Sequence, residues 1–248
     1  MTKVALIACA VFALAATSAN AARRASPLTV YAAASLTDVF PTIDSTSRYS
    51  FGGSNTLAAQ IQQGAPADVF ASANTSLPNA LYAKGLCSKP LVFARNALVI
   101  VVPRSNPAGI KSVYSLTKPG IKLDIAASGV PVGSYTLQIL KNMNLSASVL
   151  ENVVSQETDV REVLSKVALG EADAGFVYST DAKTVPGQVM VIKVPAWAQP
   201  KVQYGICVVS TSADKSEGQA FLKKVLSKPG QAKLLAAGFL PRVKPKKT

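Results

Sequence analysis

The segment LTVYAAASLT, residues 28–37, runs from a predicted β-strand through small residues into a predicted helix. Residues 28–33 are rich in β-branched and aromatic residues, which favours a strand. Ser35 follows three alanines and precedes the helix expected from Leu36. Serine is common at helix N-termini, whose free N–H groups and partial positive charge suit an anion. This segment predicts an α/β fold with an anion-binding turn, and an ordinary helix cap without a ligand is the alternative.

The same alternation continues along the chain. Five further strands are expected at residues 68–72, 97–102, 122–126, 174–178 and 204–209, and helices at 36–44, 57–63, 77–84, 135–143, 159–169, 216–226 and 231–237. Strands that alternate with helices predict βαβ units and mostly parallel sheets, and the doubled cycle predicts two α/β lobes. Ligands bind such sheets beyond the carboxyl ends of the strands.

Three more turns open predicted helices with small or hydroxyl residues. They are Phe51–Leu57, Ser128–Tyr135 and Gln156–Arg161. The paired glycines of the first would let a bound group approach the backbone, although the Lys of a phosphate-binding P-loop is absent and a plain turn is the alternative. In the last, Thr158 or Asp159 could cap the helix. Together the four helix starts predict an anion site more firmly than any one alone.

Composition argues against catalysis. The chain contains no His, and only 13 residues are acidic. The usual general base and the commonest transition-metal ligand are therefore missing, and no Gly-x-Ser-x-Gly motif occurs. A Ser–Lys hydrolase is the enzyme alternative, but no Ser-x-x-Lys is placed convincingly after a predicted strand. We expect no enzyme activity, no cofactor and no metal cation held directly by side chains.

The N-terminus has the three parts of a secretory signal peptide, which we place at residues 1–21. Lys3 is followed by an apolar run at 4–16 and by Ala19-Asn20-Ala21. The run is shorter than the ~20 residues that a membrane-spanning helix needs. If Cys9 leaves with this segment, Cys87 and Cys207 remain, and they could form a disulfide or stay separate thiols.

The net charge of +13 would attract anions. Nucleic-acid binding is the alternative, but the Lys and Arg residues are scattered. The one dense group, Lys244, Lys246 and Lys247, is typical of a solvated tail. We therefore expect no nucleic-acid partner.

Six segments, in this order, resemble the molybdate-binding proteins of bacterial ABC importers. They are Leu28–Thr37, Phe51–Gln63, Gly64–Ala73, Val130–Gly133, Asp159–Arg161 and Gly175–Ala182. The resemblance implies the two-lobed periplasmic-binding-protein type II fold with a ligand cleft between the lobes. It implies one lobe at 26–100 and 209–248 and the other at 101–208, with crossings near Leu98–Val102 and Tyr204–Val209.

The resemblance also implies a ligand set. Ser35 and Ser54 would donate hydroxyl and backbone N–H groups, Val132 and Val160 backbone N–H groups, and Tyr178 its hydroxyl. Molybdenum (or tungsten) would be bound as its oxyanion. Two departures affect ion selectivity. The segment between Leu36 and Phe51 is shorter than usual for the family, and Val132 stands where the family has Ala.

As function, the resemblance implies a monomeric receptor in the periplasm or on the outer face of the bacterial cytoplasmic membrane. It would bind molybdate or tungstate and deliver it to an ABC permease with its ATPase subunit. A receptor for another small anion, such as sulfate or phosphate, is the nearest alternative, and an extracytoplasmic enzyme on the same fold is a more distant one.

Overall fold

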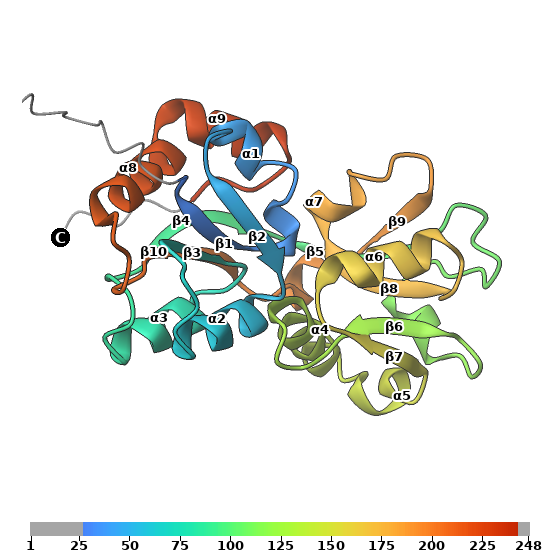
Figure 1. Ribbon diagram of the computed structural model, residues 1–248. Helices are drawn as coiled ribbons and strands as arrows, with labels where there is room; N and C mark the ends of the chain where they lie inside the picture. Colours follow the sequence, from blue (N-terminus) through green and yellow to red (C-terminus); the bar gives the residue numbers. More distant parts are fainter. Residues whose placement is uncertain (1–26, 243–248) are drawn as a thin grey trace, which may run out of the picture.

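The computed structural model describes residues 27–242, which form two α/β halves side by side (Figure 1). The predicted signal peptide and the Lys244–Lys247 tail lie outside the described residues. Each half contains one five-stranded sheet, in the order β2-β1-β3-β10-β4 or β7-β6-β8-β5-β9. The predicted α/β class with two lobes is therefore confirmed.

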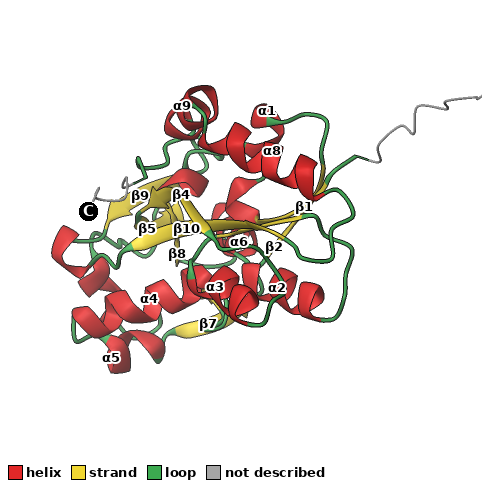
Figure 2. Cartoon of the chain, turned by 90° about the vertical axis from the view of Figure 1, so that its left-hand side faces the viewer, coloured by secondary structure: helices red, strands yellow, loops and turns green. Residues whose placement is uncertain are grey.

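The first sheet combines both ends of the described chain. Its strands are β1 (Thr29–Ala33), β2 (Arg48–Gly52), β3 (Val69–Ser72), β4 (Leu91–Asn96) and β10 (Val202–Val208). Helices α1 (Phe40–Ile43), α8 (Lys215–Leu226) and α9 (Lys228–Ala236) lie on one face, and α2 (Ser54–Gln62) and α3 (Ser76–Ala83) lie on the other (Figure 2). A short 3-10 helix, η1 (Ala34–Leu36), follows β1 directly.

The second sheet is built from the middle of the chain. Its strands are β5 (Leu98–Pro103), β6 (Leu123–Ala126), β7 (Val153–Glu157), β8 (Ala174–Tyr178) and β9 (Val189–Lys193). Helices α4 (Pro131–Asn142) and α5 (Ser146–Leu150) lie on one side, and α6 (Val160–Ala168) and α7 (Ser179–Ala182) on the other (Figure 1). The 3-10 helices η2 (Val113–Thr117) and η3 (Ala196–Ala198) lie in its connections.

Both sheets are mixed rather than mostly parallel. β2, β1 and β3 pair in parallel, as do β7, β6 and β8. β10 and β5, which follow the crossings from the opposite half, run antiparallel to both of their neighbours. The predicted parallel core is present, and the antiparallel pairs were missed because strand patterns alone do not specify direction.

The crossings differ slightly from their predicted positions. β5 belongs wholly to the second sheet and β10 wholly to the first, so the chain passes between sheets at Ala97 and within residues 194–201. We propose these positions as the lobe limits in place of those near residues 100 and 208. The difference arises because an apolar strand carries no signal of which sheet it joins.

The helix expected at residues 36–44 is also shorter than predicted. The structure has η1 there and then the four-residue α1, which contains Pro41. Proline has no N–H and fixes its own backbone angle, so it fits the first turn of α1 but not the interior of one long helix.

Cys87 and Cys207 are buried in one cluster between α2, α3 and the first sheet. Both are free thiols in the structure. Their thiols are in contact, and this contact lowers the pKa of Cys87 and raises that of Cys207. Of the two possibilities that the sequence left open, the structure has free thiols, but the two lie together.

Among residues 27–242, no helix is both long and apolar enough to cross a membrane.

In the second half, Asp124 of β6 is fully buried, and neither carboxylate oxygen has a hydrogen-bond partner among the described residues. Burial, with a smaller contribution from Glu157, raises its pKa from 3.8 to about 7, and Lys166 opposes this rise. Between these two values the folded protein holds a proton that the unfolded chain has lost, so stability falls as pH rises from about 4 to about 7.

Asp124→Asn removes this titration. We expect the melting temperature of the variant to rise relative to that of the wild type as pH increases from about 4 to about 7, as measured by calorimetry at several pH values. The other acids are common to both proteins, so the difference between the two curves reports the titration of Asp124 together with its neighbour Glu157. Parallel curves would contradict the account.

Candidate functional site

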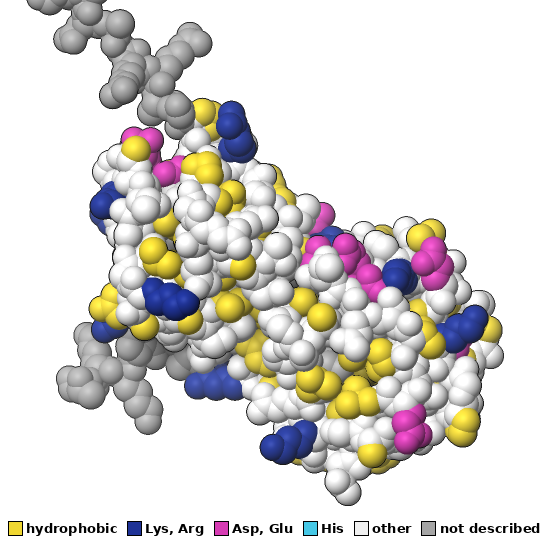
Figure 3. Space-filling view, turned by 60° about the horizontal axis from the view of Figure 1, so that its bottom comes forward, with side chains coloured by type: hydrophobic (Ala, Val, Ile, Leu, Met, Phe, Trp, Pro, Cys, Tyr) yellow, Lys and Arg dark blue, Asp and Glu magenta, His cyan; other side chains and the backbone are white. Residues whose placement is uncertain are grey.

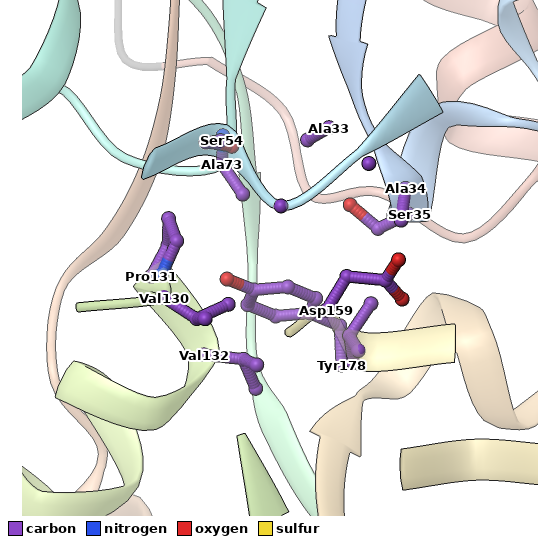
Figure 4. A pocket seen from close by; sticks show the side chains of 13 residues that line it. Ala33, Ala34, Ser35, Ser54, Ala73, Val130, Pro131, Val132, Asp159 and Tyr178 are labelled. Carbon is purple, nitrogen blue, oxygen red and sulfur yellow. The ribbon is translucent and has the colours of Figure 1, made fainter. Parts of the chain in front are cut away.

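A small pocket lies between the two halves, where the carboxyl ends of the parallel strands meet (Figure 4). Its empty volume is about 200 Å³, part of which is open to solvent. It is lined by Ala33, Ala34, Ser35, Gly52, Gly53, Ser54, Ala73, Val130, Pro131, Val132, Asp159, Val160 and Tyr178. This is the position at which open α/β sheets bind ligands.

Two serine hydroxyls reach the pocket from the first half. Ser35 lies in η1 directly after β1, and Ser54 is the first residue of α2 directly after β2. The Ser54 hydroxyl accepts a hydrogen bond of 3.1 Å from the backbone N–H of Ala73, at the end of β3. With this lone pair occupied, the proton of Ser54 is free to be donated to a ligand.

Three helix starts point their first N–H groups toward the pocket. Helices α2 and α4 have no side-chain cap, so the N–H groups of Ser54 and Val132 have no hydrogen-bond partner among the described residues. At α6, Asp159 is the N-cap and accepts from the N–H groups of Arg161 and Glu162, which leaves that of Val160. Three partial positive charges therefore converge on one space.

Tyr178 supplies a third hydroxyl from the end of β8. Its side chain is buried, and its hydroxyl oxygen has no hydrogen-bond partner among the described residues. Figure 4 shows its ring extending across the pocket beneath Ser35 and Ser54. Burial raises the pKa of Tyr178 well above its usual value, so the group stays protonated and can donate. An orphaned buried hydroxyl is costly unless a ligand satisfies it.

The hydrogen-bond donors of the pocket are uncharged hydroxyl and backbone N–H groups. Its lining contains no Lys or Arg, and its one acid is Asp159. That carboxylate caps α6, as predicted, with Oδ1 at 2.7 Å from the N–H of Arg161 and 3.2 Å from that of Glu162. The basic residues are instead dispersed over the surface, as one face of the molecule shows (Figure 3). In the described chain no group of three or more Cys, Asp or Glu is placed to hold a metal cation.

All five residues predicted as ligands, Ser35, Ser54, Val132, Val160 and Tyr178, line this one pocket. Their role as ligands stays a prediction. The sequence did not single out Ala73, whose N–H fixes Ser54, or Tyr204, whose hydroxyl lies 2.9 Å from that of Ser35. Ala73 directly follows the strand predicted at 68–72, so its position near the ligand end of the sheet could have been predicted. Nothing in the sequence connects Tyr204 to Ser35.

Comparison with known proteins matches residues 28–240 to the family described as bacterial extracellular solute-binding protein. The molybdate-binding protein ModA of Mycobacterium tuberculosis is 35% identical over 94% of this chain and 92% of its own length. ModA of Haemophilus influenzae is 33% identical over 86% of this chain and 89% of its own length.

Two solved structures share the fold. The periplasmic molybdate-binding protein of Azotobacter vinelandii superposes with a TM-score of 0.76 at 23% identity, covering 87% of this chain and 100% of that one. The sulfate-binding protein SubI of M. tuberculosis gives 0.77 at 19% identity, covering 89% and 88%. Because the two TM-scores are nearly equal, the overall fold does not distinguish a molybdate-binding protein from a sulfate-binding protein.

Proposed function

The chain belongs to the bacterial extracellular solute-binding proteins, and from this membership we propose that it is the receptor that captures molybdate for an ABC importer. The observation that carries the proposal is the pocket in which three hydroxyls and three helix-start N–H groups converge without a cationic side chain. The identity of more than 30% to two molybdate-binding proteins, over most of the chain, supports molybdate as the ligand.

The donor set suits a small tetrahedral dianion. Each charge-assisted hydrogen bond contributes about 1.5–3 kcal/mol net, so several fixed donors can hold the ion without a salt bridge. A ligand oxygen that carries a proton would meet another donor and be rejected. Tungstate, with the same charge and shape, fits the same donors, and the smaller sulfate would span them less well.

Capture rather than turnover is the chemistry that the site supports. The acid in its lining, Asp159, is held by two backbone N–H groups, and no His exists to act as a base. We propose that the protein acts as an exported monomer and presents its loaded, closed form to a membrane permease coupled to an ATPase. Sulfate remains the competing ligand, because a sulfate-binding protein has the same fold.

Removing single donors tests the proposal. Tyr178→Phe and Ser35→Ala should each weaken molybdate binding by about 1–3 kcal/mol, which is roughly 5- to 150-fold, because each deletes one hydrogen bond to the ion. Titration calorimetry measures the loss. Tyr82→Phe, on the exposed side of α3, is the matched control and should bind as the wild type does. Unchanged affinity in both site variants would contradict the proposed ligand set.

A further inference from the structure

A buried hydrogen-bond network lies directly behind Ser35. The Ser35 hydroxyl is 2.9 Å from the Tyr204 hydroxyl, and the side-chain amide nitrogen of Asn96 lies 3.4 Å from the same Tyr204 oxygen. Asn96 also donates to Thr180 at 2.9 Å. Tyr204 is completely buried, Asn96 and Ser35 nearly so, and neither Tyr204 nor Asn96 lines the pocket. These two residues can act on a ligand only through residues that line the pocket, and Ser35 is the one that shares a hydrogen bond with Tyr204.

The direction of the hydrogen bonds follows from Asn96. Its carbonyl oxygen accepts from the backbone N–H of Ala97 at 2.9 Å and from the Ser179 hydroxyl at 3.0 Å. Because a backbone N–H can only donate, this oxygen is identified, and the other atom must be the NH₂ group. The amide therefore donates to Tyr204. Of the two partners that the Tyr204 hydroxyl has among the described residues, only Ser35 can accept its proton.

The consequence is a fixed polarity at Ser35. Its oxygen accepts from Tyr204, so its own proton has no role in the network and is left for the pocket. Burial raises the pKa of Tyr204 well above its usual value, which keeps the phenol protonated and able to donate. Ser54 is held in the same sense by the Ala73 N–H. Each serine thus has one lone pair occupied and keeps its proton for the ligand.

We propose that Asn96 and Tyr204 are positioning residues that hold the Ser35 hydroxyl as a donor and so select fully deprotonated oxyanions over those that carry a proton. This inference rests on the proposed function and deepens it. The network also joins the two halves, since Asn96 precedes the crossing at Ala97 and bonds to Ser179 and Thr180 of α7.

Tyr204→Phe tests the proposal, because it removes the hydroxyl and keeps the ring that packs against Phe93, Tyr178 and Phe239. We expect molybdate affinity to fall about five- to tenfold, as for the loss of one oriented hydrogen bond. We also expect the preference for molybdate over phosphate, which carries a proton at neutral pH, to narrow, since Ser35 could then rotate and accept. Tyr49→Phe, which removes a hydroxyl bonded to Asp44 away from the pocket, is the control and should alter neither value.

A double-mutant cycle separates positioning from a general structural effect. If Tyr204 acts through Ser35, adding Tyr204→Phe to Ser35→Ala should cause no further loss of affinity. An equal loss in both backgrounds, or an unchanged molybdate-to-phosphate ratio in Tyr204→Phe, would overturn the proposal.

The wild-type protein is first titrated with molybdate, tungstate, sulfate and phosphate. If the protein prefers sulfate, the proposed function is wrong. The double-mutant cycle is then run with sulfate, and its result tests the positioning role of Tyr204 separately. If the protein binds none of these ions, both the proposed function and the proposed positioning role of Asn96 and Tyr204 are overturned.

Discussion

Replacing Gly53 with alanine is expected to weaken molybdate binding on the order of 10- to 100-fold while the protein still folds. A Cβ atom at Gly53 would lie 2.3 Å from the carbonyl oxygen of Thr158, which belongs to the opposite half. Backbone atoms cannot move aside as a flexible side chain can, and such overpacking costs about 1–3 kcal/mol. The halves would be held apart, and the donors of Val160 and Ser54 would no longer meet on one ion.

The variant should keep its stability because the clash with backbone lies between the halves, and the second close contact, 2.9 Å to Oδ1 of Asn55, is with a side chain that can shift. Gly53 has φ −59° and ψ 127°, which alanine adopts freely. Gly129→Ala is the matched control: it faces the same cleft, but its Cβ would lie 3.8 Å from the Asn55 side chain, an ordinary contact. Calorimetric titration and thermal unfolding of both variants provide the measurement. If Gly53→Ala binds as tightly as Gly129→Ala, the two halves need not approach as the structure has them.

Arg161→Leu is expected to lower the free energy of unfolding by about 3–5 kcal/mol near pH 8, the cost of leaving a buried carboxyl group without its cationic partner. The Arg161 side chain donates to Asp181 at 2.9 Å, to Thr184 at 3.2 Å and to Asp38 of the first half. Asp181 is completely buried, and burial raises its pKa, whereas the Arg161 guanidinium opposes that rise. Denaturant unfolding measures the loss.

The pH dependence and two further variants test the cause. Without Arg161, the pKa of Asp181 rises further, so the folded protein takes up a proton as pH falls and the destabilisation should be smaller near pH 5 than near pH 8. Asp181→Asn added to Arg161→Leu should restore part of the stability. Asp38→Asn should cost less than about 1 kcal/mol, since its side chain is 58% exposed. A destabilisation that is equal at both pH values would contradict the role of the buried charge.

The sequence predicted the central strands of the fold better than its edges. β1, β3, β5, β6, β8 and β10 were all expected within two residues of their observed ends, and β2, β4, β7 and β9 were not expected. The four missed strands are the edges of the two sheets. Edge strands have exposed and polar positions, as in Arg48–Gly52 and Val153–Glu157, so they lack the continuous apolar run that marks a buried strand.

The residues of the pocket could be predicted because most of them lie in turns with a recognisable local sequence. Ser35, Ser54, Val132 and Val160 each lie where a strand or loop meets a helix start, and each such turn is visible in local sequence. The network behind Ser35 was not visible, because Tyr204 is separated from Ser35 by 169 residues and from Asn96 by 108. A buried polar residue in an apolar strand has no local signal of its partner, and only the packing of β10 between β3 and β4 brings these residues together.

We propose that the pocket between the halves binds molybdate through neutral donors. Calorimetric titration of the purified protein with molybdate, and in parallel with sulfate and phosphate at one pH and salt concentration, tests this proposal most directly. We expect tight binding of one molybdate per chain, much weaker binding of sulfate and the weakest binding of phosphate. An absence of molybdate binding, or a preference for sulfate or phosphate, would contradict the proposal.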